Sequence, residues 1–342
     1  MGVTNRILLY NGCFNPPHRG HLAHLTHAFR HGGPDLALVG AVVLVAGDEY
    51  LRWKIRAGSG VLRLDVAKRV RLWNGALGLR GGDYVSEDED EGGDGEEGEG
   101  AANNWCWVLP ENSWPCIADD LDRMLEANKF AVEYVRLAGG DKVQVDSVEH
   151  GVWECRTILT TDVSRPLGFY DSTFVGEAAR APRHLWNHTE WALAWERPWT
   201  DVTAQQSDEE PDDDYTAMPR DGRPAPLGDR DVWTCARLRV PHPSGFRYAV
   251  RVVCSVPADR VDPDLSSTRV RAVIAEALAG PLGSGALVDR LRGLALSPEL
   301  LAKYVTEDLE KEKEEKEEKG EKGKEKGKQP KKGKEKEGNE CR

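Results

Sequence analysis

The most constraining feature of this sequence is the stretch LLYNGCFNPPHRGHLAHL at residues 8–25, where two prolines and two histidines separate an apolar run from a helix-like segment. The apolar run at 7–10 is short and ends at an Asn-Gly pair, which predicts a buried strand followed by a turn. The prolines exclude a regular hydrogen-bonded ladder, and the flanking glycines let the backbone approach a bound molecule closely. A helix is expected to begin near Gly20, where free N–H groups and the helix dipole favour an anion.

A second apolar, valine-rich run follows at 37–47 and predicts a central parallel strand. The segment between the two strands, from Gly20 to about His31, carries apolar residues at helical spacing. Strand, helix and strand within fifty residues form a βαβ unit, and the loop after its first strand lies at the carboxyl edge of the sheet, where ligands bind in open α/β folds. The fold class predicted is α/β, with a Rossmann-like parallel sheet and helices on both faces.

Further elements are expected along the chain on the same grounds of periodicity and turn chemistry. The run 132–141 predicts a strand that ends in a Gly-Gly-Asp turn. The other expected helices are 61–77, 117–131 and 264–278, and the other expected strands are 105–110, 156–161 and 246–256.

The net negative charge of the chain comes from two acidic segments. The net charge is −12, but nine carboxylates lie within 86–100 and six within 208–214, and the rest of the chain carries about +3 without them. We therefore expect one domain over 1–306 with an acidic loop at 86–100 and an acidic, Pro/Gly-rich loop at about 201–230, both disordered. The tail 307–342 alternates Lys with Glu and Gly, which predicts a disordered, solvated appendage that is helical at most near its start.

The cysteines and the hydropathy of the sequence indicate in which cellular compartment the protein is expected. The seven cysteines are scattered and never form a CxxC pair, so neither a disulfide framework nor a zinc knuckle is indicated. No segment approaches the length of a membrane span. We expect cytoplasm or nucleus, no membrane partner and no nucleic-acid partner, because interleaved Glu cancels most of the field of the Lys-rich tail. The oligomeric state stays open, a homo-oligomer included.

A second anion-friendly element lies at 264–278. Ser266, Ser267 and Thr268 are N-cap types ahead of a helical run. Arg269 and Arg271 fall in the first turn, where cations oppose the dipole. An external anion bound at this helix end would explain them.

These two elements carry a resemblance. GCFNPPHRGH at 12–21 resembles the (T/H)xGH signature of the nucleotidyltransferase superfamily, and LSSTRVR at 265–271 resembles its ISSTxxR signature. The Phe-Asn-Pro form is most similar to the nicotinamide/nicotinate mononucleotide adenylyltransferases. The similarity covers roughly 5–170 and 250–308.

Three middle segments resemble the same family. GDEYLRWKIR at 47–56 resembles its GDxYxKK segment, and NSWPC at 112–116 resembles its TWE stretch. LAGGD at 137–141 resembles its CGxD turn. Trp153 resembles the tryptophan that stacks on the pyridine ring.

The resemblance implies adenylyl transfer, in which the 5′-phosphate of a pyridine mononucleotide attacks the α-phosphorus of ATP in line and pyrophosphate leaves. His18 and His21 would stabilise the reacting phosphorus, and Arg271 would hold the pyrophosphate. Mg²⁺ is implied as the companion of ATP, with no protein metal site expected. The implied ATP and phosphate contacts are Gly12, Phe14, Asn15, Arg52, Lys54, Gly139, Asp141, Ser267 and Thr268, and the implied mononucleotide contacts are Trp114 and Trp153.

The departures from the family leave alternatives. Arg52 stands where the family has lysine, and 171–250 has no counterpart. A related nucleotidyltransferase with another phosphorylated acceptor, and a nucleotide-binding scaffold without turnover, therefore remain beside NAD or deamido-NAD synthesis. Amide or acid preference stays open as well.

Several of these residues also have a purely structural interpretation. His24, His27 and His31 share helical spacing with His21, and we expect a polar helix surface rather than a zinc face. Trp114 and Trp153 are alternatively core aromatics, and Asp141 is alternatively an ordinary turn residue.

Overall fold

The structure is a computed structural model of the 342-residue chain. The predicted acidic inserts at 86–100 and about 201–230 lie outside the residues that it describes. The described residues are 4–55, 62–79, 105–143, 153, 155–167, 191–196, 232–237, 249–279 and 284–326.

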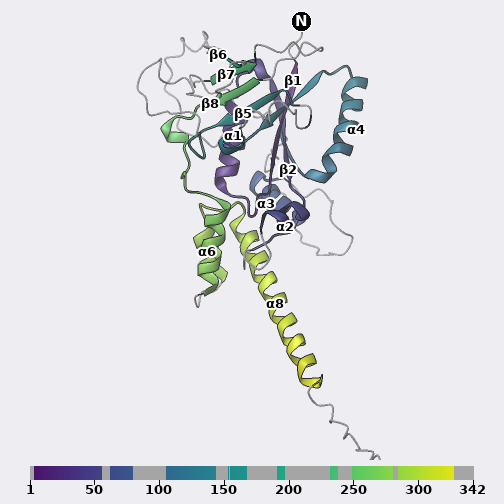
Figure 1. The fold of residues 1–342 in the computed structure, drawn as a ribbon, viewed down its shortest axis with the longest axis vertical. Coiled ribbons are helices and arrows are strands. Elements are labelled where there is room, and N and C mark those ends of the chain that lie inside the picture. Colours follow the sequence, from purple (N-terminus) through teal and green to yellow (C-terminus); the bar gives the residue numbers. More distant parts are fainter. Residues whose placement is uncertain are drawn as a thin grey trace, which may run out of the picture.

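Eight strands form one sheet in the order β3-β2-β1-β4-β5-β8-β7-β6 (Figure 1). The six strands from β3 to β8 run parallel, and β7 and β6 continue the sheet antiparallel. The chain therefore has the predicted α/β fold with a parallel sheet. The strands are β1 (Asn5–Gly12), β2 (Leu38–Val45), β3 (Cys106–Pro110), β4 (Val132–Leu137), β5 (Thr157–Thr161), β6 (Trp191–Glu196), β7 (Val232–Arg237) and β8 (Ala249–Val253).

Helices cover both faces of the parallel part. One core cluster joins alternate residues of β1 and β2 to α1 (Arg19–His31) and α3 (Val66–Leu77), with Trp73 fully buried at its centre. A second cluster on the opposite face joins the other residues of β1 and β2 to α4 (Trp114–Ala127). This alternation follows from the two-residue period of a strand, which lets a strand buried on both faces be apolar throughout.

Local chemistry sets the helix ends near the carboxyl edge of the sheet. The Asp65 carboxylate accepts from the Lys68 N–H at 2.7 Å and caps α3. At the other end of α3, Gly78 has φ +64° and terminates the helix in the left-handed region that glycine adopts without strain. The remaining helices near the sheet are α2 (Asp48–Lys54) and the 3₁₀ turns Pro34–Leu36, Glu111–Ser113, Gly140–Lys142 and Pro257–Asp259.

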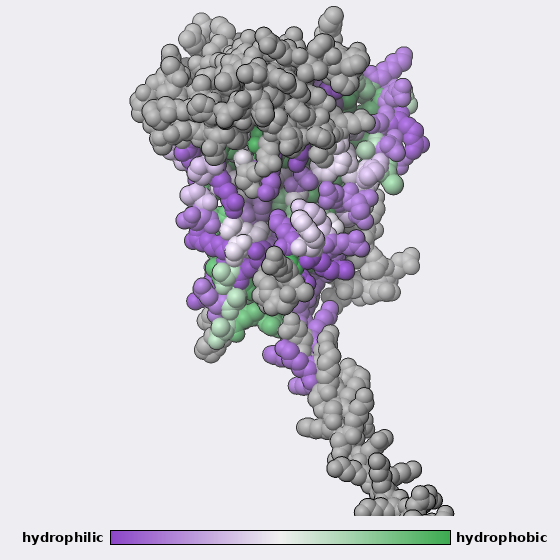
Figure 2. All heavy atoms as spheres, in the orientation of Figure 1, coloured by the Kyte–Doolittle hydropathy of each residue, from purple (hydrophilic) through white to green (hydrophobic). Residues whose placement is uncertain are grey.

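Three C-terminal helices pack together beyond the sheet edge. α6 (Ser267–Ala279), α7 (Ser284–Leu291) and α8 (Pro298–Lys326) share a cluster that includes Ile274 and Leu291. Hydrophilic residues dominate the described surface in Figure 2, while hydrophobic residues gather over α6, where Leu278 is 43% exposed.

The tail departs from the prediction of helix at most near its start. α8 continues to Lys326 and projects away from the sheet (Figure 1). Glu and Lys at a spacing of four residues, such as Glu307 and Lys311, support an exposed helix through side-chain pairing. The apolar pattern that predicts a helix fades after Leu309.

The structure also differs from expectation in two strands and in the burial of three histidines. β6 and β7 lie in the segment that had no predicted strand, because short strands between polar stretches give a weak pattern. His24, His27 and His31 are buried rather than on a polar surface. Their helix face packs on the sheet, and the rings of His24 and His27 reach the carbonyls of Ala138 and Cys254 at 3.2 and 3.4 Å.

Among the described helices, none is long and apolar enough to cross a membrane.

Candidate active site

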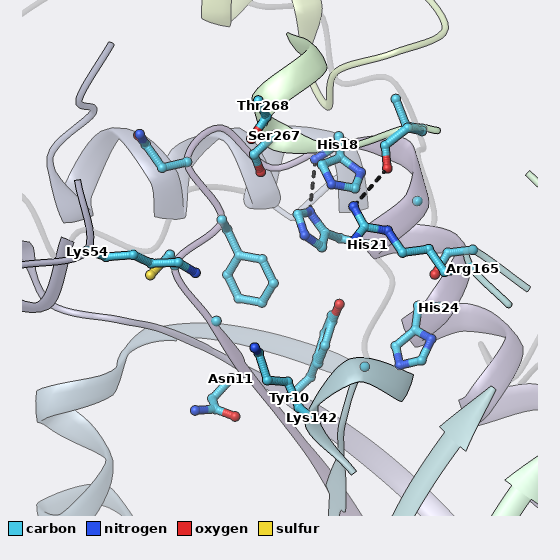
Figure 3. A pocket seen from close by; sticks show the side chains of 18 of the residues that line it. Tyr10, Asn11, His18, His21, His24, Lys54, Lys142, Arg165, Ser267 and Thr268 are labelled. Atoms are coloured by element: carbon cyan, nitrogen blue, oxygen red, sulfur yellow. Dashed lines mark hydrogen bonds between the residues drawn. The ribbon is translucent and has the colours of Figure 1, made fainter. Parts of the chain in front are cut away.

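A pocket of about 380 Å³ opens at the carboxyl edge of the parallel sheet, between the β1–α1 loop and the start of α6 (Figure 3). The end of β1 and the 3₁₀ turn after β4 form its floor, and α2 closes one side. It brings together ten of the predicted site residues, namely Gly12, Phe14, Asn15, His18, His21, Lys54, Gly139, Ser267, Thr268 and Arg271.

The β1–α1 loop is held from α3. The fully buried Arg69 donates to the Cys13 carbonyl at 2.7 Å and to the Asp48 carboxylate at 2.6 Å. The Asn15 amide donates to the Leu62 carbonyl at 2.8 Å and accepts from the Leu64 N–H at 3.0 Å. The Asn15 side chain thus positions the loop through the backbone before α3.

The same loop is also held by the C-terminal helices. The Ser267 hydroxyl donates to the Pro16 carbonyl at 2.8 Å. The backbone of 17–19 pairs with 294–296, through Arg19 N–H to Leu294 O at 2.9 Å and Leu296 N–H to Pro17 O at 3.2 Å. Segments more than 200 residues apart therefore fix the loop, as a site with a preorganised geometry requires.

His18 and His21 form a stacked pair at the start of α1. Their ring centroids are 3.6 Å apart, and the His18 backbone N–H donates to His21 Nδ1 at 3.2 Å. A neutral His21 ring whose Nδ1 accepts a hydrogen bond carries its proton on Nε2, which makes Nε2 a donor. Figure 3 shows both rings beneath Ser267 and Thr268, with Arg165 beside them.

Both histidines are neutral at physiological pH. Burial, reinforced by the charge of Arg165, lowers the pKa of His18 to about 3. Burial and then the neighbouring His18 hold the pKa of His21 well below its usual range. Neutral imidazoles can still donate hydrogen bonds, so the pair can bind phosphate oxygens without a proton from solvent.

The first turn of α6 faces the histidine pair. The Ser266 hydroxyl accepts from the Arg269 N–H at 3.2 Å and caps the helix as predicted. Arg271 donates to the Asn15 carbonyl and, at 3.0 Å, to the Thr268 hydroxyl, and it lines the pocket. Arg269 instead pairs with Asp262, so only one of the two first-turn arginines faces the pocket.

The pocket is cationic. Lys54, Lys142, Arg165 and Arg271 line it, and its lining, taken over the described residues, includes no Asp or Glu. Burial raises the pKa of the Cys13 thiol in the same wall, although Lys54 beside it acts in the opposite direction. Such a lining suits a polyanion with several phosphate groups.

The donor set does not fit a resident divalent metal. Mg²⁺ takes carboxylate and phosphate oxygens, and the described residues contain no group of three or more His, Cys, Asp or Glu arranged to hold a metal. An Mg²⁺ ion that accompanies a nucleotide triphosphate would therefore be held by the phosphates.

Four of the predicted site residues are not among the described residues that line the pocket. Arg52 is exposed on α2, whereas Lys54, two residues later, lines the pocket. Trp114 is 3% exposed in the α4-side core, and its ring packs edge-on against Tyr134 at 5.4 Å. Trp153 packs against the same core cluster, and the side chain of Asp141 lies outside the described part.

Sequence reasoning missed several lining residues. Arg165 and Ser164 follow β5, and Lys142 follows β4. Polar or cationic residues just after predicted strands are the signal that could have found them, because parallel strands end at one edge. Asn11 was missed because an Asn-Gly pair has a sufficient explanation as a turn.

Chemically, the arrangement can bind a chain of phosphates and stabilise charge that develops at one phosphorus. The histidine pair, the α6 end and the cations of α2 and of the loops after β4 and β5 converge on one space. The Cys13 thiol in this wall is not an activated nucleophile, since burial raises its pKa. Transfer between two bound substrates fits this geometry better than a covalent enzyme intermediate.

Comparison with known proteins agrees with this geometry. Residues 9–147 match the family described as Cytidylyltransferase-like. No curated protein matches the chain. The match spans the His18–His21 loop and the strands from β2 to β4, and Arg271 and α6 lie beyond it. Residues 9–147 are therefore similar to the Cytidylyltransferase-like family.

Proposed function

We propose that this protein transfers the adenylyl group of ATP to nicotinamide or nicotinate mononucleotide, giving NAD or deamido-NAD and pyrophosphate. The observation that carries the proposal is the cationic pocket around the neutral His18–His21 pair, whose described lining holds no carboxylate. A triphosphate and a mononucleotide phosphate together bring many negative charges, and such a pocket can neutralise them.

The histidine pair would act on the reacting phosphorus. An oxygen of the acceptor phosphate attacks the α-phosphorus, the bond to the bridging oxygen breaks, and that oxygen leaves with the pyrophosphate. His21 Nε2–H and the His18 ring would donate to α-phosphate oxygens as negative charge grows there. Donors fixed in advance lower the barrier because they need no reorganisation.

Cations would hold the departing pyrophosphate. Arg271 is fixed by the Asn15 carbonyl and the Thr268 hydroxyl, so its planar fork is oriented before substrate binds. Lys54 lines the same pocket from α2 (Figure 3). Mg²⁺ bound to the phosphates would neutralise further charge there.

The acceptor is inferred from the Phe14-Asn15-Pro16 sequence and from the aromatic residues on the α4 side of the sheet. The Phe14 ring packs edge-on against His21 at 4.9 Å and so supports the pair. Trp153 is partly buried against the core cluster on that side, so a pyridine ring would stack on Trp153, whereas Trp114 is buried within the cluster.

A test of the proposal mixes purified protein with ATP, Mg²⁺ and either mononucleotide and measures dinucleotide and pyrophosphate together. Equal amounts of both products are expected. Tight ATP binding without product from either mononucleotide would contradict the acceptor assignment and favour a different phosphorylated acceptor or a scaffold role.

A second candidate donor deserves the same assay. The matching family is described as Cytidylyltransferase-like, so CTP should be compared with ATP. We expect ATP to be the better donor, and a preference for CTP would redirect the proposal to cytidylyl transfer.

A further inference from the structure

A partly buried arginine with two buried, unpaired donor atoms lies on the α4 face of the sheet. Arg136 of β4 has its Nε and Nη1 atoms buried, and neither has a hydrogen-bond partner in the part of the chain that the structure describes. Burial lowers the pKa of this guanidinium. A buried, unsatisfied cationic donor is costly, so it calls for a partner.

The register settles which face Arg136 occupies. Its partners are Leu9 on β1 and Ile158 on β5, and Leu9 belongs to the α4-side core. Tyr134, two residues earlier and therefore on the same face, packs against Trp114 of α4. Arg136 thus points to the face on which Trp114 and Trp153 are found.

Cys155 connects Arg136 to the second tryptophan. The Cys155 thiol donates to the Trp153 carbonyl at 3.6 Å, and Cys155 is close enough to interact electrostatically with the Arg136 guanidinium. The Trp153 backbone has φ +54°, a conformation that costs a non-glycine residue free energy. Arg136 is therefore close to an aromatic residue whose backbone is held in a fixed conformation.

Arg136 lies one short stretch of strand away from the residues that line the phosphate pocket. Asn11, two residues beyond Leu9 on the same face of β1, lines the pocket, and Gly139, three residues beyond Arg136, lines it too. Three residues of strand span about 10 Å. In a mononucleotide the sugar separates the phosphate from the base, so a phosphate at the histidine pair leaves the base near Arg136.

Glu111, the acidic residue described at this edge, does not satisfy Arg136. Glu111 follows β3, and its carboxylate is hydrogen-bonded by the Asn11 side chain. Burial raises the pKa of Glu111. The Arg136 fork is left for an anion from outside the described residues.

We infer that Arg136 is a specificity-determining residue for the acceptor and binds a carboxylate on its base, so that the preferred acceptor is the acid mononucleotide, nicotinate mononucleotide. A guanidinium pairs with a carboxylate through two parallel hydrogen bonds, whereas a neutral carboxamide offers only one acceptor oxygen to the same fork. The inference rests on the proposed function and adds the choice between acid and amide.

The test measures kcat/KM for both mononucleotides at saturating ATP. The wild-type protein should favour the acid by at least about tenfold. Arg136→Met should lower kcat/KM for the acid by on the order of 10²-fold and change that for the amide by less than about threefold. Arg156→Met is the matched control, because Arg156 is a partly exposed arginine near Glu133, and its removal should leave the preference unchanged.

Thermal unfolding and a second variant separate binding from structure. Arg136→Met should keep or raise Tm, because it removes two buried donor atoms that lack partners; a large loss of Tm would mean that the chain itself supplies the partner and would overturn the inference. Arg136→Lys keeps the charge without the fork, so it should fold and show an intermediate preference. An unchanged preference in Arg136→Lys would also count against the inference.

The two proposals fail in different ways. Two results would overturn the role of Arg136 and leave adenylyl transfer standing. One is dinucleotide formation with a preference for the amide, and the other is an equal effect of Arg136→Met on both acceptors. No dinucleotide from either acceptor in the wild-type protein overturns the proposed function and this inference with it.

Discussion

The His18 backbone N–H donates to Nδ1 of His21 at 3.2 Å, and this bond fixes which nitrogen of His21 faces the pocket with its proton. Nδ1 is occupied as an acceptor, so the neutral ring donates through Nε2. The low pKa of both rings keeps them in this neutral form. The pair is therefore a fixed donor rather than a general acid that titrates near pH 7.

Replacing His21 by alanine should lower kcat by on the order of 10²-fold or more, because it removes a preorganised donor at the reacting phosphorus. Unfolding by urea should show that the variant remains folded. The comparison variant is His31→Ala, which changes a buried histidine on the same helix outside the pocket lining. Equal losses of activity in the two variants would assign His21 a structural role only.

The buried His18 should make stability depend on pH. Its folded pKa of about 3 lies below the ordinary value of 6.5. Between these pH values the unfolded state binds more protons, so the free energy of unfolding falls as the pH falls, by about 1.4 kcal/mol per pH unit from this one group. Above pH 6.5 its full contribution is present.

Urea titrations at pH 7, 6 and 5 check this expectation in the wild-type protein and in His18→Asn, which cannot titrate. The difference in free energy of unfolding between them should change by about 2 kcal/mol from pH 7 to pH 5, with the wild-type protein losing more. Parallel pH profiles for the two proteins would show that His18 is not buried in its neutral form.

Arg69 should be among the residues most important for stability. It is fully buried and joins the Cys13 carbonyl to the Asp48 carboxylate. Arg69→Ala should lower the free energy of unfolding by about 3–5 kcal/mol, since it leaves buried acceptors and a charge unpaired. Arg123→Ala is the control, because its pair with Asp120 is exposed and should contribute less than about 1 kcal/mol. A small effect of Arg69→Ala would mean that water replaces its contacts.

There is a physical reason why the sequence predicted the parallel sheet and the two motifs that form the site, around His18 and at the start of α6. Strands of a parallel sheet are buried on both faces, so each is a continuous apolar run. The short, valine-rich run of β2 is typical of such a strand. The loop around His18 and the N-cap at Ser266 are local features set by a few consecutive residues. These features are therefore accessible without knowledge of long-range contacts.

Long-range contacts explain what the sequence did not predict. Asn15 reaches Leu62 and Arg269 reaches Asp262, and each bond determines whether a polar side chain is used by the protein or left for a ligand. Sequence spacing cannot distinguish these two uses. The burial of His24 follows equally from the packing of α1 on the sheet, which apolar periodicity alone did not reveal.

Arg271 and Arg269 offer a matched pair for the leaving-group contact. Both lie in the first turn of α6, but only Arg271 lines the pocket, while Arg269 pairs with Asp262. Arg271→Ala should lower kcat/KM for ATP by at least tenfold, and Arg269→Ala should change it by less than about threefold. Comparable losses in both would indicate a general effect of charge on α6 rather than a contact with phosphate.

Lys54 and Arg52 test the role of α2 in the same manner. Lys54 lines the pocket next to Cys13, and Arg52 is exposed at a different angle around the same short helix. Lys54→Ala should therefore lower kcat/KM for ATP by on the order of tenfold, because a phosphate contact close to the reaction is lost, whereas Arg52→Ala should have little effect. Steady-state kinetics with ATP varied at saturating mononucleotide measures both. A larger loss in Arg52→Ala would mean that α2 rotates when ATP binds and that Arg52, in the position where the resembling family has lysine, takes over the phosphate contact.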